Sequence, residues 1–391
     1  MKRGSSYTGI KRRQVCTSCW RARDRCRKLK KMREATIPTT LPAKYYTDPT
    51  IFKAEIDRFY FGRWIYAGRE ERVEKPGDYF LCDVAGESVI VTCNASGKLQ
   101  AFYNVCRHRG TRMCTAPEGA FEGRIQCPYH GWTYALDGSL VSAPNMGGTG
   151  FSRFDYPLHQ IACDIWDGHV FLNFAAKRSQ LAEQLGELPD KFAAWKMGDL
   201  KFHKRIVYDV KANWKLIIQN YNECLHCPTV HPALDRLTDY LGADNQAPSP
   251  NYIGGSMGFR EGMETMTFDG VRRRDYLPGL NAEQRAMVCY YAIYPNLLLA
   301  LHPDYMMTHT LWPKAPDRTE IVCEWHFDPR EMAKPGFQGD DAIEFWDQIN
   351  REDWGISELS QLGIGSRAYT PGPYSKREEL LYAFDRVVTE E

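Results

Sequence analysis

The chain has 391 residues, of which 43% are hydrophobic and 25% are charged, and its formal net charge is +1. This composition is that of a globular protein, and at roughly 150 residues per domain the length predicts two or three domains. No apolar run approaches the roughly 20 residues of a membrane span, and the N-terminus has no apolar core of a secretory signal. We therefore expect a cytoplasmic protein that does not enter a membrane.

The first residues are strongly basic. Residues 1–31 hold 12 Lys or Arg and a single Asp, so the rest of the chain is mildly acidic, which argues against nucleic-acid binding by the main body. Three cysteines in the arm, Cys16, Cys19 and Cys26, have the spacing of half a fungal zinc cluster, but three thiolates do not close a tetrahedral site. We expect residues 1–34 to be a disordered arm or an extension upstream of a functional start at Met32, with DNA binding as the alternative.

The next segments predict a β domain. Residues 35–61 are a Pro/Thr-rich lead-in followed by a short amphipathic helix over 51–62, and we assign this segment to the C-terminal domain. From residue 62 to 176, short strand-like runs alternate with Gly, Asp, Asn and Pro. This pattern is typical of a small antiparallel β domain.

The C-terminal part, residues 177–391, mixes helical stretches with longer strands and ends in a helix expected over 341–362. Residues 242–258 are rich in Pro, Gly and Asn, and we expect a long surface loop there, acting as a lid. The predicted fold class is α+β, with a small β domain inserted between an N-terminal segment and a larger mixed domain.

Two cysteine–histidine pairs lie in the expected β domain, in CRHRG at 106–110 and CPYHGWTY at 127–134. Such a set can close a zinc site or hold a Rieske 2Fe–2S cluster, in which the cysteines bind one iron and the histidines the other. Zinc fingers group their histidines on a helix, whereas each pair here is mixed and lies on a loop. Gly110 and Gly131 also allow tight turns that bring backbone N–H groups toward sulfur. The pattern favours the cluster, with these ligands: Cys106, His108, Cys127 and His130.

A second group of candidate ligands lies in NYNECLHCPTVHP at 220–232. Glu223 and His226 are predicted to share one face of a helix, because they are three residues apart. His231 is five residues beyond His226, about 140° away on a regular helix, so we expect Pro228 to disturb the helix and bring the two rings together. Two histidines and one carboxylate form the facial triad of non-haem Fe(II) oxygenases.

These two motifs resemble the α (catalytic) subunits of Rieske non-haem iron ring-hydroxylating oxygenases, over roughly residues 40–390. The resemblance implies a Rieske domain over 62–176 and a helix-on-antiparallel-sheet (helix-grip-like) catalytic domain with one mononuclear Fe(II). The implied iron ligands are His226, His231 and a distant aspartate. Its pattern favours Asp353, with Glu352, Asp347 and Glu358 as rivals.

In this family the acid at position 223 is not a ligand. The resemblance implies that Glu223 connects an iron-binding histidine to a Rieske histidine of the neighbouring subunit, and hence a head-to-tail homotrimer. It also implies that Cys224 and Cys227 are packed helix thiols, although zinc binding with the histidines is an alternative. GGSMG at 254–258 lacks the pattern of a dinucleotide site, so electrons must come from a separate NAD(P)H-dependent flavin/iron–sulfur reductase.

Glu223, NECLHC and YTPGPYS at 369–375 resemble the branch that acts on glycine betaine, stachydrine, carnitine and choline. This implies O2-dependent hydroxylation or N-demethylation of a small quaternary ammonium or methylamine compound. Its cationic head would suit an aromatic cage, and candidates in the nearby strands are Tyr290, Tyr291, Tyr294 and Tyr305, each of which is equally a core residue. The alternatives are aromatic ring hydroxylation and O-demethylation of an aromatic acid by the same two metal sites. The resemblance leaves open whether one or both oxygen atoms of O2 are transferred. An electron-carrier Rieske protein and a DNA-binding regulator are the other classes.

Overall fold

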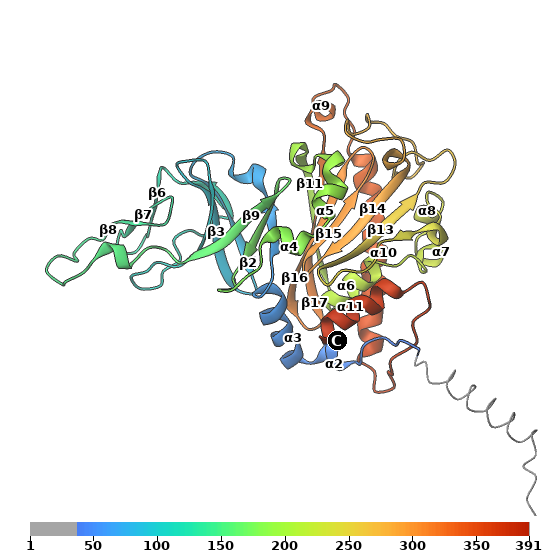
Figure 1. Ribbon diagram of the computed structural model, residues 1–391, viewed down its shortest axis with the longest axis horizontal. Helices are drawn as coiled ribbons and strands as arrows, with labels where there is room; N and C mark the ends of the chain where they lie inside the picture. The colour runs from blue at the N-terminus through green and yellow to red at the C-terminus, as the bar shows by residue number, and fades with distance from the viewer. Residues whose placement is uncertain (1–36, 391) are drawn as a thin grey trace, which may run out of the picture.

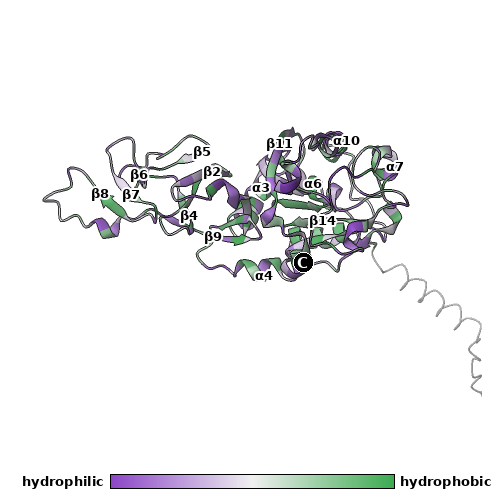
Figure 2. Ribbon diagram, turned by 90° about the horizontal axis from the view of Figure 1, so that it is seen from above, coloured by the Kyte–Doolittle hydropathy of each residue, from purple (hydrophilic) through white to green (hydrophobic). Residues whose placement is uncertain are grey.

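The computed structural model describes residues 37–390, so the expectations for Cys16, Cys19, Cys26 and Met32 lie outside the described residues. Two seven-stranded antiparallel sheets and one three-stranded sheet form the frame of the molecule. Figure 1 shows them as two parts that follow one another along the long axis, and the view from above in Figure 2 agrees. The predicted α+β class, a β domain beside a larger mixed domain, is confirmed.

The smaller part is built from ten short strands. One sheet has the order β1-β10-β9-β4-β3-β2-β5, and β6, β7 and β8 form a separate small sheet at the far end of the molecule. The strands are β1 (Ile65–Arg69), β2 (Asp78–Val84), β3 (Glu87–Cys93), β4 (Leu99–Tyr103), β5 (Glu118–Ala120), β6 (Arg124–Gln126), β7 (Thr133–Ala135), β8 (Leu140–Ser142), β9 (Gln160–Trp166) and β10 (His169–Asn173). CRHRG connects β4 to β5, and CPYHG connects β6 to β7, so both motifs lie on loops as predicted.

The larger part is a second antiparallel sheet with helices on it, in the order β11-β17-β16-β15-β14-β13-β12. Its strands are β11 (Lys201–Val210), β12 (Asp244–Asn245), β13 (Tyr252–Gly258), β14 (Met287–Ile293), β15 (Leu297–Leu301), β16 (Met306–Ala315) and β17 (Arg318–Phe327). Its helices are α4 (Leu181–Leu185), α5 (Leu188–Phe192), α6 (Trp214–Tyr221), α7 (Cys227–Val230), α8 (Pro232–Asp235), α9 (Pro329–Met332), α10 (Asp340–Ile364) and α11 (Glu379–Thr389).

Both faces of this sheet are covered, because successive side chains of a strand point to opposite faces. Along the fully buried strand β15, Leu297, Leu299 and Leu301 belong to a core that includes residues of α4 and α5. Leu298 and Ala300 belong to a core that includes residues of α6 and α10. Figure 2 shows α4 on one side of these strands and α6 and α10 on the other. The face under α6 and α10 is the one that carries the site described below.

The N-terminal segment packs on the larger part. Its helices are α2 (Lys44–Thr47), α3 (Pro49–Glu55) and a π-helical turn (Ile56–Tyr60). Glu55 Oε2 accepts a hydrogen bond from the buried Lys215 Nζ of α6 at 2.6 Å, and the ring of Phe59 lies 5.4 Å from that of Trp214. These contacts agree with assigning residues 35–61 to the larger domain, although the domain boundaries themselves stay predictions.

The expectation of a long surface loop over 242–258 is wrong. Residues of this segment form β12 and β13, which extend the sheet of the larger part beside β14. The glycines belong to the strand because its backbone approaches β14 closely. A Cβ on Gly254 would lie 2.3 Å from the carbonyl oxygen of Tyr290. The long irregular connection follows instead, between β13 and β14. The helix expected over 341–362 is confirmed as α10, but it is not the final one, because α11 follows it.

Within residues 37–390, no helix has both the length and the apolar surface needed to cross a membrane.

Candidate metal centres

The two cysteine–histidine loops of the smaller part have matching backbone turns. The N–H of Gly110 donates to Cys106 O at 3.0 Å, and the N–H of Gly131 donates to Cys127 O at 3.1 Å. Both glycines have φ near +70° (+74° and +69°), a conformation that side-chain-bearing residues rarely adopt. Glycine is therefore favoured at both turns, and the two turns bring one cysteine and one histidine each to the same end of the molecule.

The four candidate cluster ligands meet at this end of the molecule. Cys106 and Cys127 are buried, while the rings of His108 and His130 lie 4.6 Å apart nearer the surface. The ring of His108 stacks on Trp132 at 4.9 Å, which holds it in place. Two buried sulfurs behind two outer imidazoles are the donor set that a Rieske cluster needs, with histidines on the iron nearer the solvent.

Tyr134, from β7, supports the cysteine side of this set. Its Oη lies 3.5 Å from Cys106 Sγ and accepts the backbone N–H of Arg107 at 3.1 Å. Burial raises the pKa of the Cys127 thiol, and a bound metal ion would favour its thiolate form. A hydroxyl beside a ligating sulfur tunes the reduction potential of an iron–sulfur cluster, and Tyr134 has that position.

The second group of ligands lies on a turn rather than on one helix, which corrects the sequence-based account. Helix α6 ends at Tyr221, and the next helix, α7, begins only at Cys227. Glu223 and His226 are in contact as predicted, but across this turn, with Glu223 Oε1 2.7 Å from His226 Nδ1. Pro228 lies in the first turn of α7, where its missing N–H costs nothing, so it starts a helix instead of kinking one.

His226 and His231 come together because the backbone is irregular at both ends of α7. His231 follows α7 with φ −123° and ψ 66°, outside the helical region, and its ring lies 5.1 Å from that of His226. Helix α10 supplies the third group. Asp353 Oδ1 lies 2.8 Å from His231 Nε2 and 3.3 Å from His226 Nε2. One donor atom from each of the three side chains lies within 4.8 Å of the others.

The Nδ1 atoms of His226 and His231 each contact a second carboxylate. Glu223 Oε1 contacts His226 Nδ1, and Glu352 Oε2 contacts His231 Nδ1 at 2.7 Å. A metal-binding histidine commonly donates its second N–H to a carboxylate, which fixes the tautomer and orients the ring. The arrangement leaves both Nε2 atoms for a metal ion on the Asp353 side. Glu352, which the sequence offered only as a rival ligand, lies beside a histidine instead.

The other two carboxylates considered as iron ligands, Asp347 and Glu358, make their contacts elsewhere. Asp347 accepts hydrogen bonds from Tyr208 Oη at 2.8 Å and Arg351 Nε at 2.9 Å, and Glu358 accepts the backbone N–H of Lys211 at 2.9 Å. Among the described residues, His226, His231 and Asp353 are the one group whose donor atoms all lie within 4.8 Å of one another, as a single metal ion needs. The donor set of two imidazoles and one carboxylate fits Fe(II) with open positions.

The charges at this site favour a cation. Burial alone would lower the pKa of His226, but the carboxylates of Asp353 and Glu223 outweigh burial and raise the pKa to about 10. Burial works against the charge of Asp353 as well, yet its hydrogen bonds with the two histidines keep the pKa of this carboxyl below its usual value. Fields that stabilise an added proton also stabilise a dication in the same place.

Cys224 and Cys227 are not the packed thiols that we expected. They are joined in a disulfide across the turn that holds His226. The bond closes across the turn that replaces the predicted helix. Neither cysteine belongs to the group with metal-binding geometry, so the zinc alternative finds no support in this part of the chain.

A cavity of about 70 Å³ opens beside these ligands. Besides Glu223, His226, His231 and Asp353, its lining is mostly apolar and aromatic, namely Asn220, Tyr221, Cys224, Cys227, Leu234, Met257, Met266, Val288, Tyr290, Ala300, Trp346 and Ile349. None of these described lining residues is Lys or Arg. A cavity with carboxylates, aromatic rings and no basic side chain suits a small cationic ligand.

Sequence reasoning found part of this aromatic lining. Of the four tyrosines considered, only Tyr290 lines the cavity. Tyr291 donates to Gln246, Tyr294 packs on Phe384, and Tyr305 donates from Oη to Met266 O at 3.0 Å. Tyr221 and Trp346 were missed, because the faces that α6 and α10 turn to the cavity depend on where each helix ends. An aromatic residue next to the Glu223 motif is the signal that could have identified Tyr221.

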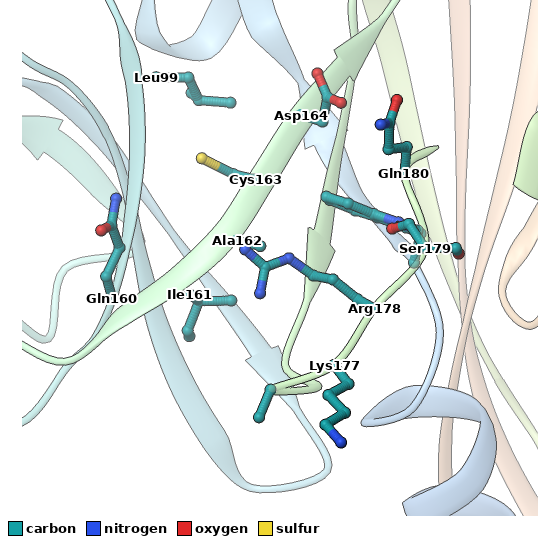
Figure 3. Close-up of a pocket in the computed structure, with 12 residues that line it drawn as sticks. Leu99, Gln160, Ile161, Ala162, Cys163, Asp164, Lys177, Arg178, Ser179 and Gln180 are labelled. Atoms are coloured by element: carbon teal, nitrogen blue, oxygen red, sulfur yellow. The ribbon is translucent and has the colours of Figure 1, made fainter. Parts of the chain in front are cut away.

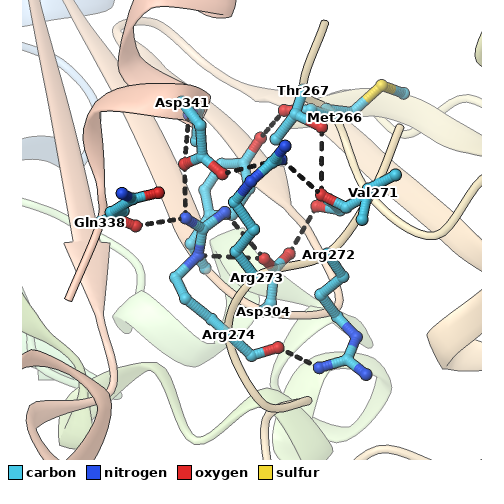
Figure 4. Close-up of polar contacts among 12 residues, drawn as sticks. Met266, Thr267, Val271, Arg272, Arg273, Arg274, Asp304, Gln338 and Asp341 are labelled. Carbon is cyan, nitrogen blue, oxygen red and sulfur yellow. Dashed lines mark hydrogen bonds and ion pairs between the residues drawn. The ribbon is translucent and has the colours of Figure 1, made fainter. Parts of the chain in front are cut away.

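A buried ion-pair network holds the cavity wall against α10 (Figure 4). Arg274 lies between Asp304, at 2.9 Å, and Asp341 at the start of α10, at 2.5 Å. Asp304 also accepts a hydrogen bond from Thr265, the neighbour of Met266 in the cavity wall. The segment between β13 and β14 is therefore fixed to the same helix that carries Asp353. Removing one partner of such a pair leaves the other charge buried and unpaired, which strongly destabilises the fold.

A separate hollow of about 920 Å³ lies where strand β9 meets the segment leading to α4. Figure 3 shows Cys163 and Asp164 on the strand and Lys177 and Arg178 on the segment opposite. This hollow shares no lining residue with the cavity beside His226, and it has no histidine. The metal chemistry therefore belongs to the smaller cavity.

Two family models match this chain. The model described as "Rieske [2Fe-2S] domain" matches residues 63–160, and the model described as "Ring hydroxylating alpha subunit (catalytic domain)" matches residues 197–391. The first contains the four candidate cluster ligands and the second contains His226, His231 and Asp353. The catalytic-domain match also excludes a bare electron carrier.

Two relatives of known activity match most of the sequence of this chain. It is 29% identical over 370 residues to "Glycine betaine monooxygenase oxygenase subunit" of Pseudomonas aeruginosa (strain UCBPP-PA14), covering 87% of this chain and 86% of the relative. It is 27% identical over 362 residues to "Choline monooxygenase, chloroplastic" of Arabidopsis thaliana, covering 88% and 81%. A crystal structure of a quaternary ammonium Rieske monooxygenase has the same fold, with a TM-score of 0.78 at 24% identity over 90% of this chain and 95% of the other.

The chain belongs to the Rieske non-haem iron oxygenases, as a catalytic α subunit. Members of this class carry a Rieske 2Fe–2S cluster and a mononuclear iron, and the residues described above fit both groups. The protein is thus an oxidoreductase, and oxygenase subunits of this kind work with a separate reductase on a small-molecule substrate.

The contact between Glu352 and His231 predicts a change in metal retention. Glu352→Ala removes the carboxylate that orients the His231 ring, so the variant should hold mononuclear iron roughly tenfold or more weakly while keeping its cluster. Glu344→Ala, an exposed glutamate on the same helix, is the matched control. Iron retained during dialysis against a chelator, with cluster absorbance as the reference, measures the effect. Equal retention in both variants would contradict the role of Glu352.

Proposed function

We propose that the chain is the oxygenase subunit of a Rieske monooxygenase that hydroxylates a carbon attached to the nitrogen of a small quaternary ammonium or methylamine compound. The observation that carries the proposal is the cavity beside His226, His231 and Asp353. Three aromatic side chains (Tyr221, Tyr290 and Trp346) line it, with two carboxylates and no Lys or Arg. Aromatic faces attract quaternary ammonium groups, and the relatives named above act on glycine betaine and choline.

The proposal assigns the metal ligands as follows. The cluster would be held by Cys106, His108, Cys127 and His130. Mononuclear iron would be held by His226, His231 and Asp353, whose donor atoms already converge. When bound, the cluster supplies electrons one at a time, and the iron supplies open positions where O2 can be reduced beside the substrate.

The protein's own residues would orient the reactants. Glu223 and Glu352 hold the two imidazoles through their Nδ1 atoms, so that both Nε2 atoms remain directed at the Asp353 side. The apolar lining, which includes Leu234, Met257 and Ile349, keeps bulk water from the cavity. Trp346 is fixed by the hydrogen bond that its Nε1 donates to Tyr305 Oη at 2.8 Å. The aromatic wall is thus set before a substrate arrives.

The proposed reaction balances with two electrons and two protons. One oxygen atom of O2 enters a C–H bond of an N-methyl group, and the other leaves as water. The resulting N-hydroxymethyl compound breaks its C–N bond, releasing formaldehyde, a proton and the demethylated amine. The electrons come from a separate NAD(P)H-dependent flavin/iron–sulfur reductase.

The same proposal includes a head-to-tail homotrimer. Strands β6 to β8, which flank the cluster loops, and helix α7 lie at opposite ends of the molecule in Figure 1. Electrons from a cluster would therefore reach an iron more directly in a neighbouring subunit. The solved quaternary ammonium monooxygenase is described in terms of inter-subunit electron transfer. A closed ring of identical subunits satisfies this geometry.

Glu223 has the right place to connect two subunits. Together with Cys224 and Tyr290, it lines both the cavity and an outer hollow of about 310 Å³. Its Oε1 contacts His226, which leaves the outer hollow as the side from which a neighbour's Rieske histidine would approach. A carboxylate between two imidazoles provides a short hydrogen-bonded path for an electron.

The function is tested with a substrate panel and a surrogate reductase. Glycine betaine, choline, carnitine and trimethylamine form one arm, and benzoate and a methoxybenzoate form the other. We expect an N-methyl compound to give close to one formaldehyde for each NADH and O2 consumed. Ring hydroxylation or O-demethylation of the aromatic acids, without turnover of the first arm, would contradict the proposal. NADH consumption without product does not count as turnover.

The bridging role of Glu223 gives a second prediction. Glu223→Gln removes the negative charge but keeps the size of the side chain, so both metals should remain while reoxidation of the reduced cluster in the presence of substrate and O2 slows at least about tenfold. Glu223→Asp, which keeps the carboxylate, should retain more of the wild-type rate. Stopped-flow absorbance of the cluster measures this step, and an unchanged rate in Glu223→Gln contradicts the bridge.

A further inference from the structure

Tyr221 has an unpaired hydroxyl group in the wall of the substrate cavity. It is the last residue of α6, two positions before Glu223, and it lines the same cavity as the candidate iron ligands. Its Oη is buried and has no hydrogen-bond partner among the described residues. Of the described residues that line the cavity, Tyr221 is the only one with a buried, unpaired side-chain oxygen or nitrogen. An unpaired buried hydroxyl costs free energy, so it indicates a group that a ligand completes.

Most other polar groups around the cavity are already committed. His226 and His231 each have a carboxylate on both ring nitrogens, and the Nε1 of Trp346 donates to Tyr305. The carboxylates of Glu223 and Asp353 are acceptors and repel an oxygen that carries partial negative charge. No Lys or Arg lines the cavity, and the remaining side-chain donors in its wall are the amide of Asn220 and Tyr221 Oη, of which only Oη is buried and unpaired. An acceptor oxygen on a substrate therefore finds its buried donor at Tyr221.

The hydroxyl of Tyr221 keeps its proton, and its ring is held in place. Burial, with further contributions from nearby acidic groups, raises the pKa of Tyr221 well above its usual value, so the group keeps its proton at neutral pH. Its ring lies edge-on to His309, at 6.0 Å, and His309 Nε2 is in turn 3.0 Å from Asn350 Oδ1 of α10. The position of Oη is therefore set by packing of the Tyr221 ring on β16, while the hydroxyl hydrogen can turn toward an acceptor.

We propose that Tyr221 donates a hydrogen bond from Oη to an oxygen atom of the substrate, and that it thereby selects N-methylated compounds that carry a hydroxyl or carboxylate oxygen. The aromatic wall would hold the cationic end, while Tyr221 would hold the oxygen-bearing end and so determine which carbon faces the iron. The inference rests on the proposed function for its substrate class. A neutral donor serves a hydroxyl or a carboxylate oxygen, so the two sources are separated by experiment.

The test compares binding of matched pairs of compounds to the iron-loaded, cluster-containing protein. Choline is paired with propyltrimethylammonium, and glycine betaine with isobutyltrimethylammonium, because each second compound replaces oxygen by carbon at similar size. Isothermal titration gives Kd for each. In the wild type we expect one oxygen-bearing compound to bind at least about tenfold more tightly than its partner. Tyr221→Phe should abolish that ratio by weakening the oxygen-bearing compound alone.

Tyr294→Phe is the matched control. Tyr294 also has a buried, unpaired hydroxyl, but it packs on Phe384 and does not line the cavity, so the ratio should stay as in the wild type. Cluster absorbance and iron content report whether each variant is intact. The pair that loses its ratio identifies the oxygen as hydroxyl or carboxylate.

Three outcomes would overturn the inference. The wild type could bind both members of each pair equally, Tyr221→Phe could weaken both members equally, or Tyr294→Phe could have the same effect as Tyr221→Phe. Turnover separates this inference from the proposed function. Tight, Tyr221-dependent binding without any formaldehyde would leave the inference standing and contradict the N-demethylation. Formaldehyde production with an unchanged ratio in Tyr221→Phe would do the reverse.

Discussion

Asp353 Oδ1 lies within 3.3 Å of the Nε2 atoms of both His226 and His231, and this convergence is what the catalytic domain is built to maintain. The contact with His231 joins the end of α7 to the middle of α10, 122 residues further along the chain. Neither element holds the geometry alone, because the histidines lie on irregular backbone. Carboxylates behind each ring and the packing of both elements on one face of the sheet fix the geometry. The Arg274 network secures the start of α10 from the other side.

The same constraint explains the division of the molecule. A cluster needs loops with buried sulfurs and outer imidazoles, which the small β domain provides near its tip. An iron site with open positions needs a dry cavity, which the helices and sheet of the larger domain provide. The two requirements are met at opposite ends of one chain, and this separation supports the proposal that electrons pass between copies. Glu223, at the wall between the cavity and the outer hollow, is where the two functions meet.

Motif spacing predicted the parts of the site that depend on short stretches of chain. The two glycine turns follow from CRHRG and CPYHG, and the contact of Glu223 with His226 follows from three-residue spacing. The sequence could not separate Asp353 from Glu352, because neighbouring acids on a helix differ only in the direction they face. It also misread 242–258 as a loop, since glycines that permit close strand packing resemble glycines of a turn. The Cys224–Cys227 disulfide was missed because the family resemblance implied packed thiols there, and Tyr221 was missed because spacing does not show which face of α6 borders the cavity.

The central claim is that one chain holds both the electron store and the oxygen-activating iron for a substrate bound beside it. A single-turnover reaction without any reductase tests it most directly. The protein is reduced chemically, freed of excess reductant and mixed with O2 and the N-methyl compound that binds most tightly. The account predicts that cluster and mononuclear iron each lose one electron while formaldehyde approaches one molecule per iron. Full reoxidation of the cluster by O2 with no formaldehyde would contradict it.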